Sequence, residues 1–101
     1  MNINQKLNKI TISDLDTNTK RVAYRLLTAK GQWMPKSRIA GRNVRSVASR
    51  IRDLRTTKYG GFRVECKTAA ELGKAVAKQT YYYRINPNTV THKQVDAVFD
   101  I

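Results

Sequence analysis

The chain has few residues that could cross-link it or hold a metal: one cysteine, Cys66, and one histidine, His92, among 101 residues. A single cysteine excludes an intrachain disulfide, so a reducing compartment is expected, and Cys66 is interpreted as a small core residue. Two such ligands fall short of a zinc site, and neither a metal nor a cofactor is predicted. The sequence also lacks a glycine-rich phosphate loop and a paired-carboxylate motif, so no enzyme activity is predicted.

Acidic residues are also scarce, with 7 Asp and Glu against 20 Lys and Arg, which gives a formal charge of +13 and a pI of about 10.4. So much charge on a small chain repels itself and is most useful beside a polyanion. Nucleic acid is therefore the leading partner class, ahead of an anionic membrane surface. No apolar run approaches the roughly 18 residues that span a bilayer, and the first residues lack the apolar core of a secretion signal. We therefore expect no membrane partner.

The length suits one domain, and 41% hydrophobic residues are enough for a modest core. Residues 1–13 are mostly polar and predict a loosely attached N-terminal arm. Residues 14–86 carry the strongest periodicity and predict the folded domain, and residues 87–101 predict a turn and a short helix.

The most informative segment is a predicted helix over residues 43–57. Its apolar residues follow the spacing of one helix face: Val44, Val47, Ala48, Ile51 and Leu54. Asn43 stands where a helix N-cap is expected, and Gly60-Gly61 suits the end of the helix.

The opposite face of this helix is basic and polar, and consists of Arg42, Arg45, Ser46, Ser49 and Arg50. One interpretation is an ordinary solvated face. The other is a helix that enters the DNA major groove, where arginine pairs with guanine and short polar groups contact phosphates and base edges.

Two further helices are expected before this one. Val22, Ala23, Leu26 and Leu27 predict a helix over 17–30, and Pro35 suits the first position of a short helix over 35–40. Gln32–Met34 is expected as an extended link, with Trp33 in the core. Helix, short helix, turn and basic helix together form a helix-turn-helix pattern.

After Gly60-Gly61 the apolar period changes to two, which predicts strands over 62–68 and 78–85. A reversal at Leu72-Gly73 would place Phe62 opposite Tyr83. The alternative for residues 68–79 is an alanine-rich helical insert. The tyrosines at 81–83 suit ordinary strand packing, or else a stacking platform for single-stranded nucleic acid.

A last helix is predicted up to about Phe99, because Thr91 and Gln94 have the spacing of a capping box. Its apolar face, which includes Val95 and Val98, is expected either to dock on the domain or to form a homodimer contact.

Three segments, 47–55, 58–65 and 81–85, together resemble the small winged helix-turn-helix DNA-binding proteins of bacteriophages and bacteria. The resemblance covers roughly residues 17–86. It implies an α+β fold in which three helices precede a β-hairpin wing. In such proteins the third helix enters the major groove, which implicates Arg42, Asn43, Arg45, Ser46, Ser49 and Arg50. The wing contacts backbone or minor groove, which implicates Lys67, Lys74 and Lys78. Lys36, from the short helix, completes the candidate set.

The sequence therefore predicts sequence-specific binding of double-stranded DNA, by a transcriptional regulator or a phage accessory factor in the cytoplasm of a bacterial or phage-infected cell. One alternative is binding to RNA or a ribonucleoprotein. Another is a protein-interaction module that acts on a host enzyme.

Overall fold

A computed structural model of the chain describes residues 2–40, 46–74 and 80–101. The described residues form helices and a small antiparallel sheet, so the expected α+β class is confirmed. The α-helices are α1 (Ile3–Asn8), α2 (Asn18–Thr28), α3 (Lys36–Ala40), α4 (Val47–Leu54) and α5 (His92–Phe99), and the strands are β1 (Met34–Pro35), β2 (Val64–Thr68) and β3 (Tyr81–Ile85). Three 3₁₀ turns, η1 (Ile12–Asp14), η2 (Thr57–Tyr59) and η3 (Pro87–Thr89), lie between them.

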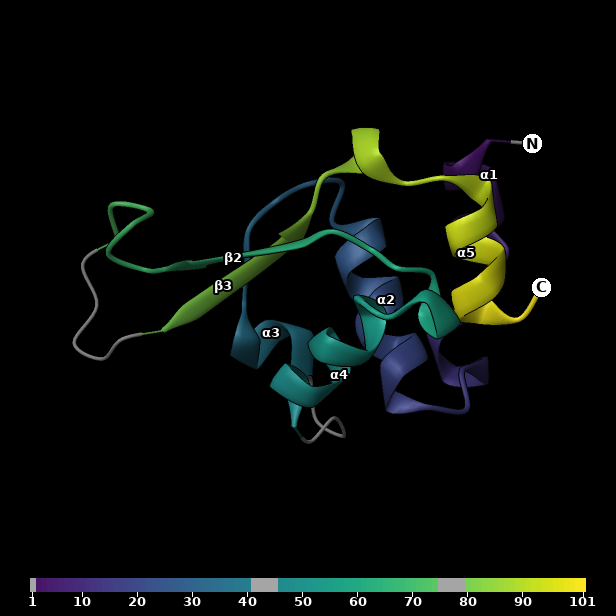
Figure 1. The fold of residues 1–101 in the computed structure, drawn as a ribbon, viewed down its shortest axis with the longest axis horizontal. Coiled ribbons are helices and arrows are strands. Elements are labelled where there is room, and N and C mark those ends of the chain that lie inside the picture. Colours follow the sequence, from purple (N-terminus) through teal and green to yellow (C-terminus); the bar gives the residue numbers. More distant parts are fainter. Residues whose placement is uncertain (1, 41–45, 75–79) are drawn as a thin grey trace.

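The sheet has the strand order β1-β3-β2, and both pairings are antiparallel. The hairpin of β2 and β3 extends beyond the helices, at the left of Figure 1. The strand β1 was expected only as an extended link, because two residues are too few to show a period. It pairs Met34 with Tyr83 and Pro35 with Tyr82, so it ties the segment before α3 to the hairpin.

The hydrophobic core lies where α2, α4 and α5 meet the base of the sheet. From α2, Val22, Ala23 and Leu26 are at most 1% exposed. Ile51 and Leu54 of α4 are also buried, as their spacing predicted. Burial of these side chains is the main favourable contribution to folding.

The helix expected over 43–57 is shorter in the structure. It begins at Val47, with Ser46 as the residue before its first turn, and it ends at Leu54. The two glycines end the 3₁₀ turn η2 instead, where Gly60 has a left-handed φ of 106°. Ala48, assigned to the buried stripe, is exposed, because only one narrow face of so short a helix meets the core.

The predicted strand register was wrong. Tyr83 pairs with Cys66, and Val64 pairs with Ile85, whereas Phe62 had been expected opposite Tyr83. Side chains alternate along a strand with a period of two, so a shift by an even number of residues leaves every side chain on its expected face. The apolar pattern alone therefore could not select the register.

Two residues expected in the core lie elsewhere. Cys66 is exposed, because the hairpin at that point has extended past most of the helices. Trp33 is only partly buried, and its ring contacts Arg84 and Lys67 of the sheet. Tyr83 occupies the inner face instead and is 8% exposed.

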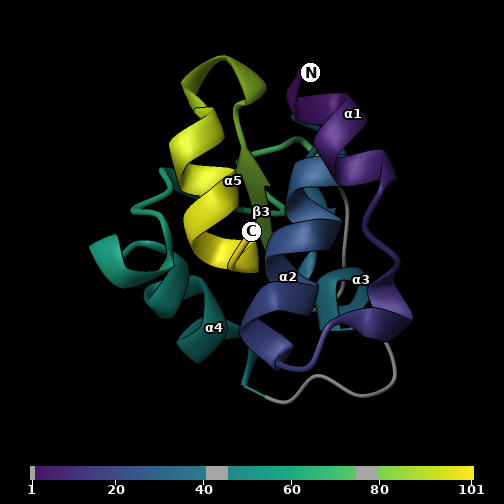
Figure 2. The same cartoon turned by 90° about the vertical axis from the view of Figure 1, so that its right-hand side faces the viewer.

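The N-terminal segment differs from the loosely attached arm that its polar composition suggested. Its residues 3–8 form α1, which begins with a capping box between Asn2 and Gln5. Leu7 is 3% exposed and belongs to the core, and Lys6 Nζ lies 2.8 Å from Asp96 Oδ1 of α5. Figure 2 shows α1 and α5 on either side of α2.

The capping box predicted for the last helix is confirmed. The side chain of Thr91 accepts a hydrogen bond from the backbone N–H of Gln94, and the side chain of Gln94 accepts one from Thr91. Val95 and Val98 are buried in the core cluster. The apolar face of α5 therefore docks on the domain and is not left for a homodimer contact.

At the tip of the hairpin, residues 69–73 form hydrogen-bonded turns, and none of the residues described between 68 and 74 is helical. Residues 75–79, the rest of the proposed insert, lie outside the described residues. In the part of the chain that the structure describes, no helix combines the length and apolar character needed to cross a membrane.

Candidate nucleic-acid interface

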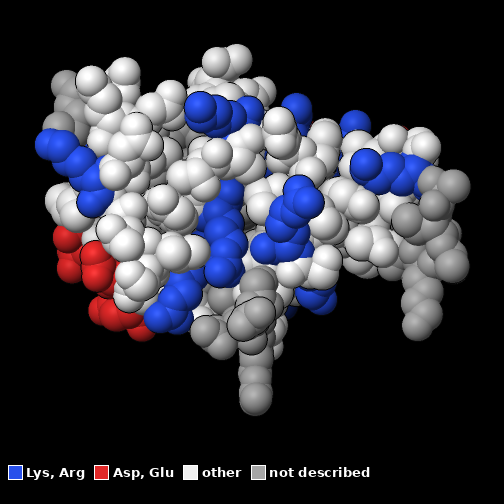
Figure 3. Space-filling view, turned by 180° about the vertical axis from the view of Figure 1, so that it is seen from behind, with Lys and Arg blue, Asp and Glu red and all other residues white. Residues whose placement is uncertain are grey.

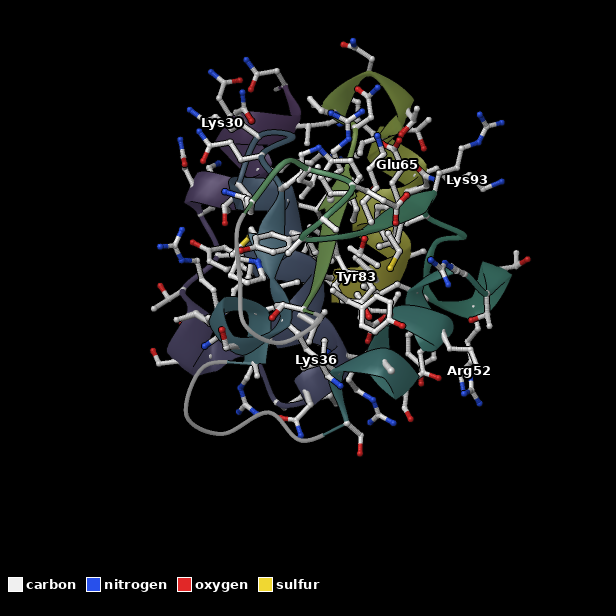
Figure 4. The ribbon with its side chains drawn as sticks, turned by 90° about the vertical axis from the view of Figure 1, so that its left-hand side faces the viewer. Lys30, Lys36, Arg52, Glu65, Tyr83 and Lys93 are labelled. Carbon is white, nitrogen blue, oxygen red and sulfur yellow. The ribbon has the colours of Figure 1, made fainter. Side chains whose placement is uncertain are left out.

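The helices α3 and α4 pack against each other and present exposed basic side chains at one end of the molecule. Lys36 and Arg38 are exposed on α3, and Arg52 is exposed on α4. Figure 4 shows Lys36 and Arg52 at this same end, on their neighbouring helices. The orientation of α4 follows from its buried side, because Val47, Ile51 and Leu54 face the core. We call Lys36 and Arg52 the helical basic surface.

Ser46 and Ser49, two of the predicted contact residues, lie at the start of α4. Ser46 has a left-handed backbone with φ 56° and ψ 53°, which is uncommon for a residue with a side chain. Its side chain caps no N–H of the helix, while its carbonyl accepts hydrogen bonds from the N–H groups of Ser49 and Arg50 at 2.9 and 3.1 Å. Ser46 is exposed and Ser49 is partly buried.

Arg50, the third predicted contact residue on α4, pairs with Asp53 of the same helix. Its Nε lies 3.4 Å from Asp53 Oδ2, and the same carboxylate oxygen accepts a hydrogen bond of 3.2 Å from the hydroxyl of Thr19. The guanidinium and the carboxylate are close enough for an ion pair, but the Nε–H is not aligned for a hydrogen bond. Asp53 thus lies between α4 and α2, where its negative charge is offset by Arg50.

Two other arginines bind backbone carbonyls and hold the interface together. Arg25 of α2 donates to the carbonyl oxygens of Ile39 and Ala40 at 2.8 and 3.2 Å, which satisfies two acceptors at the end of α3. Arg55 donates to the carbonyl oxygen of Val64 at 2.8 Å and ties the end of α4 to β2. These two arginines contribute to positioning as well as to charge.

The hairpin carries the second group of predicted contacts. Lys67 and Lys74 are both exposed, and each stands over an aromatic ring. Lys67 Nζ is 5.5 Å from the ring centroid of Trp33, and Lys74 Nζ is 5.4 Å from that of Tyr82. Cations at this distance from a ring are attracted by its electron-rich face. The lysines of the hairpin are therefore paired with aromatic rings of the sheet.

Lysines and arginines outnumber acidic residues, and exposed carboxylates lie on the hairpin as well as before α2. Figure 3 shows lysines and arginines across one face of the molecule, with acidic side chains gathered at one edge. Asp14 and Asp16 precede α2 and are exposed. Asp16 Oδ1 lies 3.1 Å from Lys20 Nζ, and this hydrogen-bonded lysine lowers the pKa of the Asp16 carboxyl. Neither carboxylate belongs to α3 or α4.

Four of the predicted contact residues lie outside the described residues: Arg42, Asn43, Arg45 and Lys78. The structure brings Lys36 and the α4 residues to one end, whereas Lys67 and Lys74 lie on the hairpin. Sequence reasoning missed Arg52, although on a helical wheel Arg52 lies at least as far from the apolar stripe as Arg50. In the structure Val47, Ile51 and Leu54 are buried and Arg52 is exposed.

The described residues contain no group of three or more side chains that could hold a metal ion. Comparison of the chain with protein families, curated proteins and solved structures gave no match.

Proposed function

We propose that this chain is a double-stranded DNA-binding protein of the winged helix-turn-helix type, with α4 in the major groove and the hairpin on the backbone or minor groove. The observation that carries the proposal is the helical basic surface, in which Lys36 of α3 and Arg52 of α4 are exposed at the same end of two packed helices (Figure 4). The order α2, α3, α4 and then the β2–β3 hairpin also supports it.

Charge supports the same proposal. A net charge of +13 provides affinity for phosphates along a duplex. The acidic residue of α4, Asp53, is turned toward Thr19 and Arg50, so it does not oppose phosphate at the exposed end of the helix. Arg52 is suited to reading a base, because a planar guanidinium on a helix can pair with both acceptors of guanine.

The biological role that fits best is that of a transcriptional regulator or a phage accessory factor, since both depend on choosing a site on a duplex. Selection from random duplexes, run beside a pool of structured RNA, tests the choice of nucleic acid. Enrichment of a duplex motif supports the proposal, whereas preferential enrichment of RNA would replace it with the ribonucleoprotein alternative.

Single variants then test the assignment of Arg52. Arg52→Ala should weaken binding to the selected duplex by about 1–3 kcal/mol and relax preference at one base position. Lys36→Ala should weaken binding to selected and scrambled duplexes alike. If Lys36 contacts one phosphate, the slope of log binding constant against log salt concentration should fall by about one in magnitude.

Lys93 provides the matched control, because it is exposed on α5, away from α3 and α4 (Figure 4). Lys93→Ala removes one positive charge without touching the helical basic surface. Equal losses for Arg52→Ala, Lys36→Ala and Lys93→Ala, on every duplex, would show a general polyanion binder and contradict the proposal.

A further inference from the structure

The outer face of the sheet carries aromatic and basic side chains that the core does not use. The strands alternate, so Val64, Tyr83 and Ile85 face inward and are buried. The outward positions are Glu65 and Lys67 on β2, Tyr82 and Arg84 on β3, and Pro35 on β1. Trp33 directly precedes β1 and lies beside Arg84 in the same register.

The contacts on this face form a layered arrangement. The Cζ atom of Arg84 lies 4.9 Å from the ring centroid of Trp33, and Arg84 Nε donates to Glu65 Oε2 at 2.7 Å. Lys67 Nζ lies 5.5 Å from the same ring, and Lys74 Nζ lies 5.4 Å from the ring of Tyr82. The carboxylate thus fixes the guanidinium, while the two lysines carry exposed charges. We call Trp33, Lys67, Lys74, Tyr82 and Arg84 the sheet platform.

The platform has two rings and three cations, with the carboxylate of Glu65 on Arg84 and that of Glu71 near Lys67. This excess of rings and cations matches the chemistry of an unpaired nucleotide strand. The faces of unpaired bases stack on aromatic rings and on arginine planes, while lysines contact the phosphates between them. In a duplex each base is already stacked on its neighbours, so its face is closed to a ring. Trp33 and Tyr82 keep part of their surface open to solvent, as stacking requires.

We propose that the sheet platform binds single-stranded DNA, with an unpaired base stacked against Trp33 and Arg84 and the adjoining phosphates held by Lys67 and Lys74. The choice of DNA rather than RNA rests on the proposed function, because the same chain is proposed to contact a duplex through α3 and α4. The binding surface itself is separate from the helical basic surface.

Trp33 reports on its own site, because it is the only tryptophan in the chain. The full chain is titrated with an oligothymidylate of about 12 nucleotides, within the range of known site sizes. Stacking on Trp33 predicts saturable quenching of tryptophan fluorescence. No quenching at a concentration where anisotropy shows the oligonucleotide bound would overturn the proposal.

Adjacent tyrosines of β3 provide a matched pair of variants. Tyr82 points outward and contacts Lys74, whereas Tyr81 lies on the other face and is 46% exposed. Tyr82→Ala should weaken binding of the oligothymidylate by about fivefold to 150-fold, the range for one lost stack, and Tyr81→Ala should leave binding unchanged. Equal losses for the two variants would overturn the proposal.

Thermal unfolding shows whether Trp33→Ala is folded. Trp33→Phe keeps an aromatic ring and serves as the second variant in case Trp33→Ala is not. Trp33→Phe should retain most of the binding, and a folded Trp33→Ala should lose it by a similar factor to Tyr82→Ala. If Trp33→Ala is folded and binds as tightly as wild type, the platform is not the site.

Further measurements distinguish single-strand binding at the sheet platform from duplex binding by α3 and α4. Arg52→Ala should weaken duplex binding and leave quenching by the oligothymidylate intact. Duplex binding that depends on Arg52 without quenching of Trp33 would remove the platform and leave the proposed function standing. Tighter binding of oligouridylate, or quenching by anionic lipid vesicles but not by the oligothymidylate, would overturn the assignment to single-stranded DNA.

Discussion

The guanidinium of Arg25 donates a hydrogen bond of 2.8 Å to the carbonyl oxygen of Ile39. Arg25 is on α2 and Ile39 is on α3, so this bond crosses between two helices of the proposed DNA-binding unit. Since the last carbonyls of a helix have no partner within it, an arginine from outside can satisfy them. The position of α3 therefore depends on a residue that the sequence would class as an ordinary surface cation.

Arg25→Ala should destabilise the fold by about 1.5–3 kcal/mol, the range for a hydrogen bond to a charged group. Arg38→Ala is the control, because it removes an exposed arginine of α3 and should stay within about 0.5 kcal/mol. Denaturant unfolding of both variants provides the measurement. Equal losses would mean that Arg25 does not hold α3.

Truncation of the core should separate the two sides of α4. Ile51→Ala and Leu54→Ala should each cost about 2–5 kcal/mol, because both side chains are at most 2% exposed. Ala48→Gln, on the exposed side, should change stability by no more than about 0.5 kcal/mol. Thermal unfolding that ranks Ala48→Gln with the core variants would mean that α4 faces another way.

Two glycines with left-handed backbones should respond differently to alanine. A Cβ on Gly60 would lie 2.7 Å from Phe62 Cε2 and 2.9 Å from the backbone oxygen of Gln94, at a φ of +106°. Strain and overpacking together predict a loss of about 2–6 kcal/mol for Gly60→Ala.

Gly73 has a φ of +72°, and a Cβ there would meet nothing within 4 Å. Gly73→Ala should therefore cost only the backbone term, about 1–2 kcal/mol. Equilibrium unfolding in denaturant compares the two variants. A loss for Gly73→Ala equal to that of Gly60→Ala would contradict the packing assigned to Gly60.

Stability should fall at alkaline pH because of Tyr83. Burial, with a smaller contribution from Cys66, raises the pKa of the Tyr83 phenol above its ordinary value of 10.0. Above that pH the unfolded chain releases the proton while the folded chain keeps it, so the unfolded state binds fewer protons and stability decreases as pH rises. The contribution of the protonated Tyr83 phenol to stability is fully present below pH 10. It is lost as the pH rises through the pKa of Tyr83 in the folded chain.

The variant Tyr83→Phe separates the ionisation of Tyr83 from that of the lysines, because the lysines titrate alike in wild type and in the variant. Urea unfolding across pH 9 to 11 should show a steeper decrease for wild type than for Tyr83→Phe, roughly above the unfolded pKa of tyrosine. Parallel pH dependences would show that Tyr83 ionises as easily in the folded chain as in the unfolded one.

Local signals predicted local structure well. Thr91 and Gln94 identified the start of α5 because a capping box needs only residues three apart. The buried residues of α2 followed from their spacing. Asn2 and Gln5 carried the same kind of signal for α1, but the polar composition of the segment concealed it.

Features that depend on distant residues were not predictable in this way. In the observed register of β2 and β3, Val64 pairs with Ile85 and Glu65 pairs with Arg84. The apolar alternation fits equally well any register shifted by an even number of residues, so it could not select this one. The contact of Arg84 with Trp33 depends on β1, which has no sequence pattern of its own.

The junction between sheet and helix has a mechanical consequence. Strand β1 ends at Pro35 and α3 begins at Lys36, so no residue separates them. Because β1 is paired with β3, and α3 packs against both strands, a hinge at this point would disturb the strand pairing or these contacts. We therefore expect α3 and the paired part of the hairpin to move together as one rigid unit. If the proposed function holds, a duplex that contacts both must bend or change its groove width to fit them. Sequences that deform easily would then be favoured at positions that no side chain touches.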